Sequence, residues 1–281
     1  MRLIVCVKAV PDPGIPVGKG PGDPAWDPAS WYWDLNPPDG AALAVALGLR
    51  GSEDNITAVS LGPHAPRALR RALALGADRA VHLADRSWED LDIVGTARIL
   101  SEAIRRLGFD LVLCGHAAVD EQGESLPAAL AALLDCPLLT PVVEARQEAD
   151  GLVARTRLPH GRRARLSPRL PAVLAVEGTV PRENASLPVY LQALTTPLLV
   201  WDASGLGIGG VAPRVARLSL GFPRPRPKKI FTPDSRLSAA ERLRQMMTGG
   251  RVEKKADLFT GTPAQAAEHI LGALRKEGVT Q

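Results

Sequence analysis

Short apolar runs alternate with amphipathic segments along the first half of the chain. The apolar runs are rich in β-branched side chains and bounded by turn residues, which is typical of strands buried on both faces. They cover residues 2–10, 56–61, 80–83 and 110–114. The segments between them begin at proline or acidic residues and mostly end at glycine, so they predict helices. These helices cover residues 38–50, 66–75, 88–107 and 124–135.

This alternation predicts right-handed βαβ crossovers and therefore an α/β, Rossmann-like fold, with a mostly parallel sheet and helices on both faces. The pattern changes near residue 138, where two polar-alternating strands flank a turn at Asp150 and Gly151. Residues 171–177 predict one more buried strand. We therefore expect the sheet to gain antiparallel or edge strands late in the chain.

Glycine and proline interrupt the chain after residue 205, and two further helices are predicted near residues 238–248 and 263–277. Apolar residues along an irregular backbone are poorly buried by themselves, which favours a segment that wraps a partner. We therefore divide the chain into an α/β domain, residues 1–205, and an extended C-terminal arm, residues 206–281.

Composition excludes several classes of protein. Hydrophobic residues make up 46% and charged residues 23%, so a core can form, and a net charge of +4 gives little support for nucleic-acid binding. No apolar run is long enough to span a bilayer, and the N-terminus lacks a secretory signal. The three cysteines have neither disulfide-framework nor zinc spacing, and Cys6 and Cys114 lie in apolar runs as buried thiols. A reduced, cytoplasmic compartment is expected.

The most promising chemistry follows the apolar run 110–114. A polar loop, residues 115–125, leads into the helix 124–135 and delivers N–H groups that suit a phosphate, with Ser125 adding a hydroxyl. Acidic residues in this loop disfavour a triphosphate; they are Asp120, Glu121 and Glu124. An ordinary surface loop with a Ser/Glu cap remains the alternative.

The proline-rich stretch after the first apolar run concentrates aromatic side chains. They are Trp26, Trp31, Tyr32 and Trp33. They predict either a hairpin packed by its own aromatics or a surface for a partner or a flavin. Asn36 follows them, either as a helix cap or as a hydrogen-bonding group directed at a nucleotide.

Two motifs resemble known sites without their context. The glycines of residues 205–210 match G-x-G-x-x-G, but a proline and irregular sequence follow where a helix should begin. Residues 123–127 resemble a nucleophile elbow, yet Ser125 lies well past the strand and no histidine has a triad context. The candidate bases are His116, His160 and His269. The residues alone thus predict a nucleotide-binding α/β domain with no evident catalytic set, plus an arm.

Several stretches carry a resemblance to one family. LIVCVKAVPDP (residues 3–13) and LNPPDGAALAVAL (35–47) are followed by AVSLGPHAPRALRRALALGADRAVHL (58–83). DLVLCGHAAVDEQGES (110–125) and LPAVLAVEGTVPRENASLP (170–188) come next. LGIGGVAPRV (206–215) and PKKIFTP (227–233) lie in the arm. Over nearly its whole length the chain resembles the electron-transfer flavoprotein beta subunit, in the longer form that includes electron-bifurcating types.

The resemblance implies an electron carrier and not a self-standing enzyme. A beta subunit pairs with an alpha subunit that holds FAD, and the heterodimer carries electrons between dehydrogenases, or NADH, and a membrane-associated quinone reductase or another acceptor. The beta subunit itself holds AMP or, in bifurcating types, a second FAD.

The resemblance also implies which positions form the nucleotide site and the partner contact. The nucleotide-binding positions are Cys6, Asn36, Asp39, Leu61, Gly115, His116, Ala117, Ala118, Val119, Asp120, Glu121, Gln122, Gly123, Glu124 and Ser125. The partner-binding positions are Leu187 and Pro188. The alternative is a nucleotide-binding sensor, or a hydrolase that uses Asp120 or Glu121.

Overall fold

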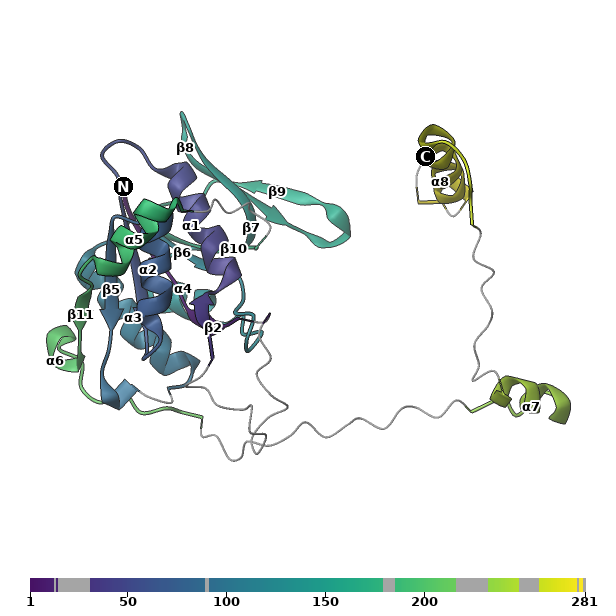
Figure 1. Ribbon diagram of the computed structural model, residues 1–281, viewed down its shortest axis with the longest axis horizontal. Coiled ribbons are helices and arrows are strands. Elements are labelled where there is room, and N and C mark those ends of the chain that lie inside the picture. Colours follow the sequence, from purple (N-terminus) through teal and green to yellow (C-terminus); the bar gives the residue numbers. More distant parts are fainter. Residues whose placement is uncertain are drawn as a thin grey trace. The chain divides into compact units, whose positions relative to one another are not determined.

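Within the residues that the structure describes, nine strands form one sheet in the larger of two units, Met1–Phe222 (Figure 1). The structure is a computed structural model that describes residues 1–12, 14, 31–88, 91–178, 185–215, 232–247, 258–276 and 278–279. In spatial order the strands are β11 (Leu199–Trp201), β5 (Arg79–Leu83), β4 (Asn55–Leu61), β1 (Arg2–Cys6), β6 (Leu111–Gly115), β10 (Ala172–Val176), β7 (Leu138–Glu148), β8 (Gly151–Arg157) and β9 (Arg163–Leu166).

The strands from β11 to β7 pair in parallel, and only β8 and β9 pair antiparallel to their neighbours. The antiparallel members form where the sequence predicts them, with β7 and β8 joined at Asp150 and Gly151. The predicted α/β fold with a mostly parallel sheet is confirmed.

The direction of the crossovers reverses between β1 and β6. The helices α1 (Pro37–Leu49) and α2 (Ala65–Leu75) link β1 to β4 and β4 to β5 on one side of β1. The helix α3 (Ile93–Leu107) then returns the chain to β6 on the other side of β1, and α4 (Leu126–Leu134) follows β6. In such a sheet the crevice beyond the carboxyl ends of the two diverging strands is a ligand site.

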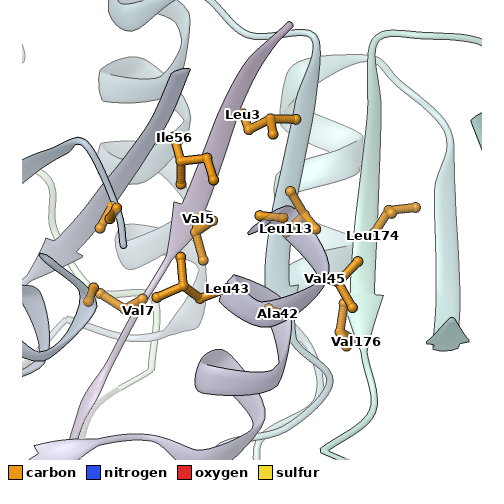
Figure 2. Close-up of a cluster of buried hydrophobic side chains, with 14 of the residues drawn as sticks. Leu3, Val5, Val7, Ala42, Leu43, Val45, Ile56, Leu113, Leu174 and Val176 are labelled. Atoms are coloured by element: carbon orange, nitrogen blue, oxygen red, sulfur yellow. The ribbon is translucent and has the colours of Figure 1, made fainter. Parts of the chain in front are cut away.

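Alternate side chains of the central strands supply two separate cores. On one face Leu3 and Val5 of β1 meet Leu43 of α1, with Leu113 and Leu174 beside them (Figure 2). On the opposite face Ile4, Cys6, Val112 and Cys114 pack against α3 and α4. Cys6 and Cys114 are free, buried thiols, as their apolar surroundings predict.

The prediction of one strand over residues 2–10 is wrong. β1 ends at Cys6, and Ala9–Pro11 forms β2, which pairs antiparallel with β3 (Trp33–Leu35) in a separate small sheet. Lys8, which lies between β1 and β2, donates its N–H to the Asp39 carboxylate, and its carbonyl accepts the N–H of Asn36. These contacts replace strand pairing at Lys8, so the chain leaves the main sheet after Cys6.

The predicted start of the helix at residue 88 is also wrong. Trp88 lies buried in a 3₁₀ turn, η1 (Arg86–Trp88), and α3 begins at Ile93. The side chain of Asp92 accepts the N–H of Gly95 at 2.8 Å, which makes Asp92 the N-cap. The acidic sequence at this point therefore indicates the N-cap, Asp92, and not residues inside the helix.

The first part of the predicted arm lies on the larger unit. A one-turn helix, α6 (Ala203–Leu206), follows β11, and Leu206 is buried with Ile208 and Val211 packed beside it. Farther on, Asp92 accepts the backbone N–H groups of Arg214 and Val215. Phe222 ends this unit, and a second unit begins at Pro223.

The second unit, Pro223–Gln281, contains α7 (Ala239–Met247) and α8 (Pro263–Lys276) among its described residues, as predicted. Neither helix buries a residue, and both expose large apolar side chains. These are Leu243, Met246, Met247, Ile270 and Leu271. In the described part of the chain, no helix is both long and apolar enough to cross a membrane.

Substituting Leu113→Ala should lower the free energy of unfolding by about 2–5 kcal/mol, because Leu113 is fully buried between β1 and β10 and its loss leaves a cavity. The matched control is Leu199→Ala on the edge strand β11, where the leucine is 51% exposed and the change should stay within about 0.5 kcal/mol. Urea unfolding of the full chain measures both, and equal losses would contradict this account of the core.

Candidate functional site

A pocket of about 550 Å³ opens at the carboxyl ends of β1 and β6, where the crossovers diverge. Its size lies in the range that small-molecule and cofactor sites occupy. The residues that line it are Cys6, Val7, Lys8, Asn36, Asp39, Val59, Leu61, Leu91, Asp92, Ile93, Thr96, Leu100, Cys114, Gly115, Ala117, Ala118, Glu121, Gly123, Leu126 and Pro127.

Asp39 joins the ends of the two diverging strands. Two prolines start α1, and Asn36 precedes them as its N-cap residue, so Asp39 falls in the first helical turn. Its carboxylate accepts the N–H of Lys8 at 2.8 Å, beyond β1, and the N–H of Gly115 at 2.9 Å, at the end of β6. The side chain is thereby almost completely buried, and it closes the floor of the crevice.

Gly115 must lack a side chain for this contact to form. A Cβ atom at this position would lie 2.4 Å from the Asp39 carboxylate oxygen and 2.7 Å from the Cβ of Pro38. The close approach of β6 to the start of α1 therefore depends on glycine.

Asn36 holds the loop that follows β6. Its Nδ2 donates to the carbonyl of Ala117 at 3.1 Å, and its Oδ1 accepts the N–H of Val119 at 3.2 Å. Farther along, Gln122 adopts a left-handed conformation and donates its N–H to Ala118 at 2.8 Å, which closes a turn. These hydrogen bonds fix the conformation of the loop, which forms one wall of the pocket. Both polar atoms of the Asn36 amide are bonded to the loop backbone.

Lys8 ties the same loop to the end of β1. Its Nζ lies 2.8 Å from the Asp120 carboxylate and 3.6 Å from that of Glu121. Lys8 was not selected from the sequence, because it was placed inside a strand over residues 2–10. The one available signal was its charge, since the other residues from Leu3 to Val10 are uncharged.

Apolar side chains form the opposite wall. Val59 and Leu61 come from β4, Ile93 and Leu100 come from the first half of α3, and Leu91 comes shortly before it. Of these only Leu61 was selected from the sequence. The contribution of α3 depends on the strand order, because α3 reaches this edge only by crossing from β5 over to β6.

The structure brings together nine of the predicted nucleotide-binding residues along this pocket. These are Cys6, Asn36, Asp39, Leu61, Gly115, Ala117, Ala118, Glu121 and Gly123. The remaining predicted residues belong to the same loop but do not line the pocket. They are His116, Val119, Asp120, Gln122, Glu124 and Ser125.

The start of α4 faces the pocket through Leu126 and Pro127. Ser125 stands at the N-cap position, is exposed, and makes no side-chain capping bond. Because Pro127 has no N–H group, the free donors of this first turn come from its other residues. This helix start therefore leaves N–H groups without a capping side chain near the pocket.

The charges around the pocket are unequal. Among the described lining residues Lys8 is the only cation, while Asp39, Asp92 and Glu121 are acids. Burial raises the pKa of Asp39 to about 7, against the hydrogen bonds from Lys8, Asn36 and Gly115, which lower it. Burial raises the pKa of the Cys6 thiol to about 12, so this thiol stays protonated at neutral pH.

Neither motif that resembled a known site has the required geometry. Ser125 is not hydrogen-bonded to a histidine; His116 instead lies 3.7 Å from Glu124 and contacts Thr140. Gly205 lies inside the one-turn helix α6, and residues 208–215, which the structure describes directly after it, form no helix that could receive a pyrophosphate. Trp26 lies outside the described residues. β2 and β3 pair antiparallel, the rings of Trp31 and Trp33 lie 6.0 Å apart, and Trp33 also stacks on His64.

Leu187 and Pro188 start a separate helix, α5 (Leu187–Thr195), away from this lining. Leu187 is 68% exposed, and Val189 and Leu191 are also exposed. The guanidinium of Arg70 donates to the carbonyls of Ala193 and Thr196, at 2.8 and 3.2 Å, and so holds the end of α5 against α2.

A second pocket, of about 430 Å³, opens between α2 and α5. Three arginines of α2 line it together with aromatic residues and Leu187. The arginines are Arg67, Arg70 and Arg71, and the aromatic residues are Tyr32, Trp33 and Tyr190. The exposed leucine therefore stands beside a basic surface.

Asp39→Asn should change how stability depends on pH. The pKa of Asp39 is raised from 3.8 to about 7 in the folded chain. Between these two pH values the carboxyl group is therefore ionised in the unfolded chain but still protonated in the folded chain. The wild-type protein should therefore lose stability relative to Asp39→Asn as the pH rises from 4 to 7, by roughly 4 kcal/mol in all. Urea unfolding at a series of pH values measures the difference, and parallel curves would contradict the assignment.

Comparison with known proteins connects this site to one family. The electron transfer flavoprotein domain matches residues 32–205, which include most of the pocket. An electron transfer flavoprotein subunit beta of Thermoanaerobacterium thermosaccharolyticum is 29% identical over 99% of this chain and 100% of its own length. Protein FixA of Rhizobium meliloti is 30% identical, over 99% of this chain and 97% of its own.

A third relative is the acryloyl-CoA reductase electron transfer subunit gamma of Anaerotignum propionicum. It is 30% identical over 73% of this chain and 79% of its own length. The matched domain covers more than half of the chain and the relatives cover most of it, in agreement with the resemblance of its motifs. The chain belongs to the electron transfer flavoprotein family.

Proposed function

We propose that the chain is the beta subunit of a heterodimeric electron-transfer flavoprotein and that its pocket holds the adenylate part of a nucleotide. One observation carries this proposal: in a chain related to such subunits, the strand ends β1 and β6 open into a pocket walled by the loop 115–125. Apolar walls and an uncapped helix start suit an adenine ring and a phosphate.

The chemistry of the pocket supports a carrier and not an enzyme. The Asp39 carboxylate accepts two backbone N–H groups, and the Cys6 thiol is held protonated. A hydrolase using Asp120 or Glu121 has less support, because both carboxylates are paired with Lys8. The redox chemistry then belongs to the flavin, and the subunits orient it and tune it.

Two nucleotides share the required adenylate, namely AMP and FAD. A second FAD in this subunit would be accompanied by electron bifurcation, whereas AMP would leave the FAD of the alpha subunit as the single redox group. In the bifurcating arrangement the electron donors include NADH. In the arrangement with AMP the donors are dehydrogenases, and the electrons pass on to a quinone reductase or another acceptor.

The second unit, Pro223–Gln281, which is the greater part of the predicted arm 206–281, is proposed to wrap the alpha subunit. Support comes from α7 and α8, which bury no residue of their own and expose Leu243, Met246 and Ile270. Helices of this kind become stable when an apolar face packs against another protein.

Leu187 and Pro188 are proposed to contact the electron-transfer partner. α5 contains no charged residue, exposes its apolar side chains and stands beside the arginines of α2. An exposed apolar anchor next to a basic surface suits a partner with an apolar recess and an acidic rim. The relative named as an acryloyl-CoA reductase subunit is consistent with a dehydrogenase-type partner.

Co-expression of the chain with its alpha subunit should give a yellow complex that releases an adenine nucleotide on denaturation. Two FAD per heterodimer identifies the bifurcating arrangement, and one FAD with one AMP identifies the other. Flavin absorbance and chromatography of the released nucleotides give the count. A colourless chain that never binds a flavin-bearing subunit would contradict the proposal.

Leu187→Ala should slow electron transfer with the partner dehydrogenase by about tenfold or more, because an exposed anchor contributes mainly to docking. Flavin content should not change, since the leucine lies outside the nucleotide pocket. The control is Leu158→Ala, a leucine that is 39% exposed and follows β8. The reduction rate of the bound flavin by the dehydrogenase measures the effect, and equal rates for both variants would rule out this contact.

A further inference from the structure

Lys8 has a position in the pocket that its structural contacts do not explain. Among the described lining residues it is the only cation, in a pocket that otherwise carries acids. An adenine nucleotide brings negative charge into that pocket, and a cation beside the phosphate strengthens its binding through charge-assisted hydrogen bonds.

The backbone of Lys8 is fixed independently of its side chain. The N–H is bound to Asp39 and the carbonyl to Asn36, so the Cα position does not depend on the ammonium group. The Lys8 side chain is 41% exposed, and those of Asp120 and Glu121 are 20% and 78% exposed. The pair with Glu121 is exposed and contributes little to stability, while that with Asp120 is half-buried. Lysine is a point charge on a flexible stem, so its ammonium group can exchange partners.

The two acids that hold Lys8 belong to the loop that walls the pocket. Nζ lies 2.8 Å from Asp120 and 3.6 Å from Glu121, and Asp120 also accepts the N–H of Glu121 at 2.8 Å. Without a ligand these acids neutralise the lysine. With a phosphate in the pocket they compete with it for the same ammonium group.

We propose that Lys8 is the phosphate-binding cation of this pocket and that Asp120 and Glu121 hold its ammonium group until a nucleotide displaces them. This proposal rests on the proposed function, because it requires that the pocket receive an adenine nucleotide. It makes the site select phosphorylated ligands over adenosine, and it limits their affinity through the competing carboxylates.

The alternative role of Lys8 is a strap that only holds the loop in place. The two roles predict opposite changes in the affinity for phosphorylated ligands when Asp120 and Glu121 are neutralised. If the ion pair is a strap, removing either side loosens the loop and weakens every ligand alike. If the acids compete with the phosphate, neutralising them strengthens binding of phosphorylated ligands and leaves adenosine unchanged.

The test measures dissociation constants for AMP, FAD and adenosine by titration calorimetry, using the full chain with its alpha subunit after bound nucleotide has been removed by dialysis. Lys8→Met should weaken AMP or FAD by about tenfold or more, with adenosine unchanged, and Lys8→Arg should restore most of the affinity. The double variant Asp120→Asn/Glu121→Gln should bind the phosphorylated ligand about threefold to tenfold more tightly.

Arg2→Met is the matched control, because Arg2 is paired with Asp110 at the opposite end of β1 and should leave all three constants unchanged. Weaker binding of both phosphorylated ligand and adenosine in the double variant would overturn the proposal in favour of the strap. Unchanged constants for Lys8→Met would also overturn it. A wild-type complex that binds neither AMP nor FAD would instead refute the proposed function.

Discussion

The carboxylate of Asp39 is the contact on which the pocket at the ends of β1 and β6 depends. Where β1 and β6 diverge, the N–H groups of Lys8 and Gly115 need acceptors that no neighbouring strand supplies, and Asp39 provides both. The burial of this carboxylate is unfavourable, as the raised pKa shows, but the two bonds keep the strand ends together. Gly115 makes the arrangement possible because a Cβ would overlap the carboxylate.

The first turn of α1 therefore builds the pocket as well as facing it. Asp39 fixes the floor, and one turn earlier Asn36 binds the backbone of Ala117 and Val119 in the wall. Both residues line the pocket, yet their polar atoms are used by the protein's own backbone. Sequence similarity alone does not separate such wall-building residues from ligand-binding ones, and the hydrogen-bond partners do.

Hydrophobic period and turn residues were enough to predict most elements, because each buried strand and each helix start has a local signal. The loop 115–125 was also predictable, since it follows a buried parallel strand. The contribution of Leu91, Ile93 and Leu100 was not, because it depends on the strand order that α3 spans. Lys8 and the end of β1 were missed for a related reason: residues 2–10 form one apolar run, and the contacts that divide it come from Asp39 and Asn36, more than one element away.

The same burial that shapes the pocket also removes reactivity from it. Thiols usually become nucleophiles through a lowered pKa, whereas burial raises that of Cys6 to about 12 and raises that of Cys114 well above its ordinary value. Asp39 is bound at both oxygens, and the loop acids face Lys8. A pocket built in this way can hold and orient a nucleotide without acting on it, which is what the proposed function requires of it.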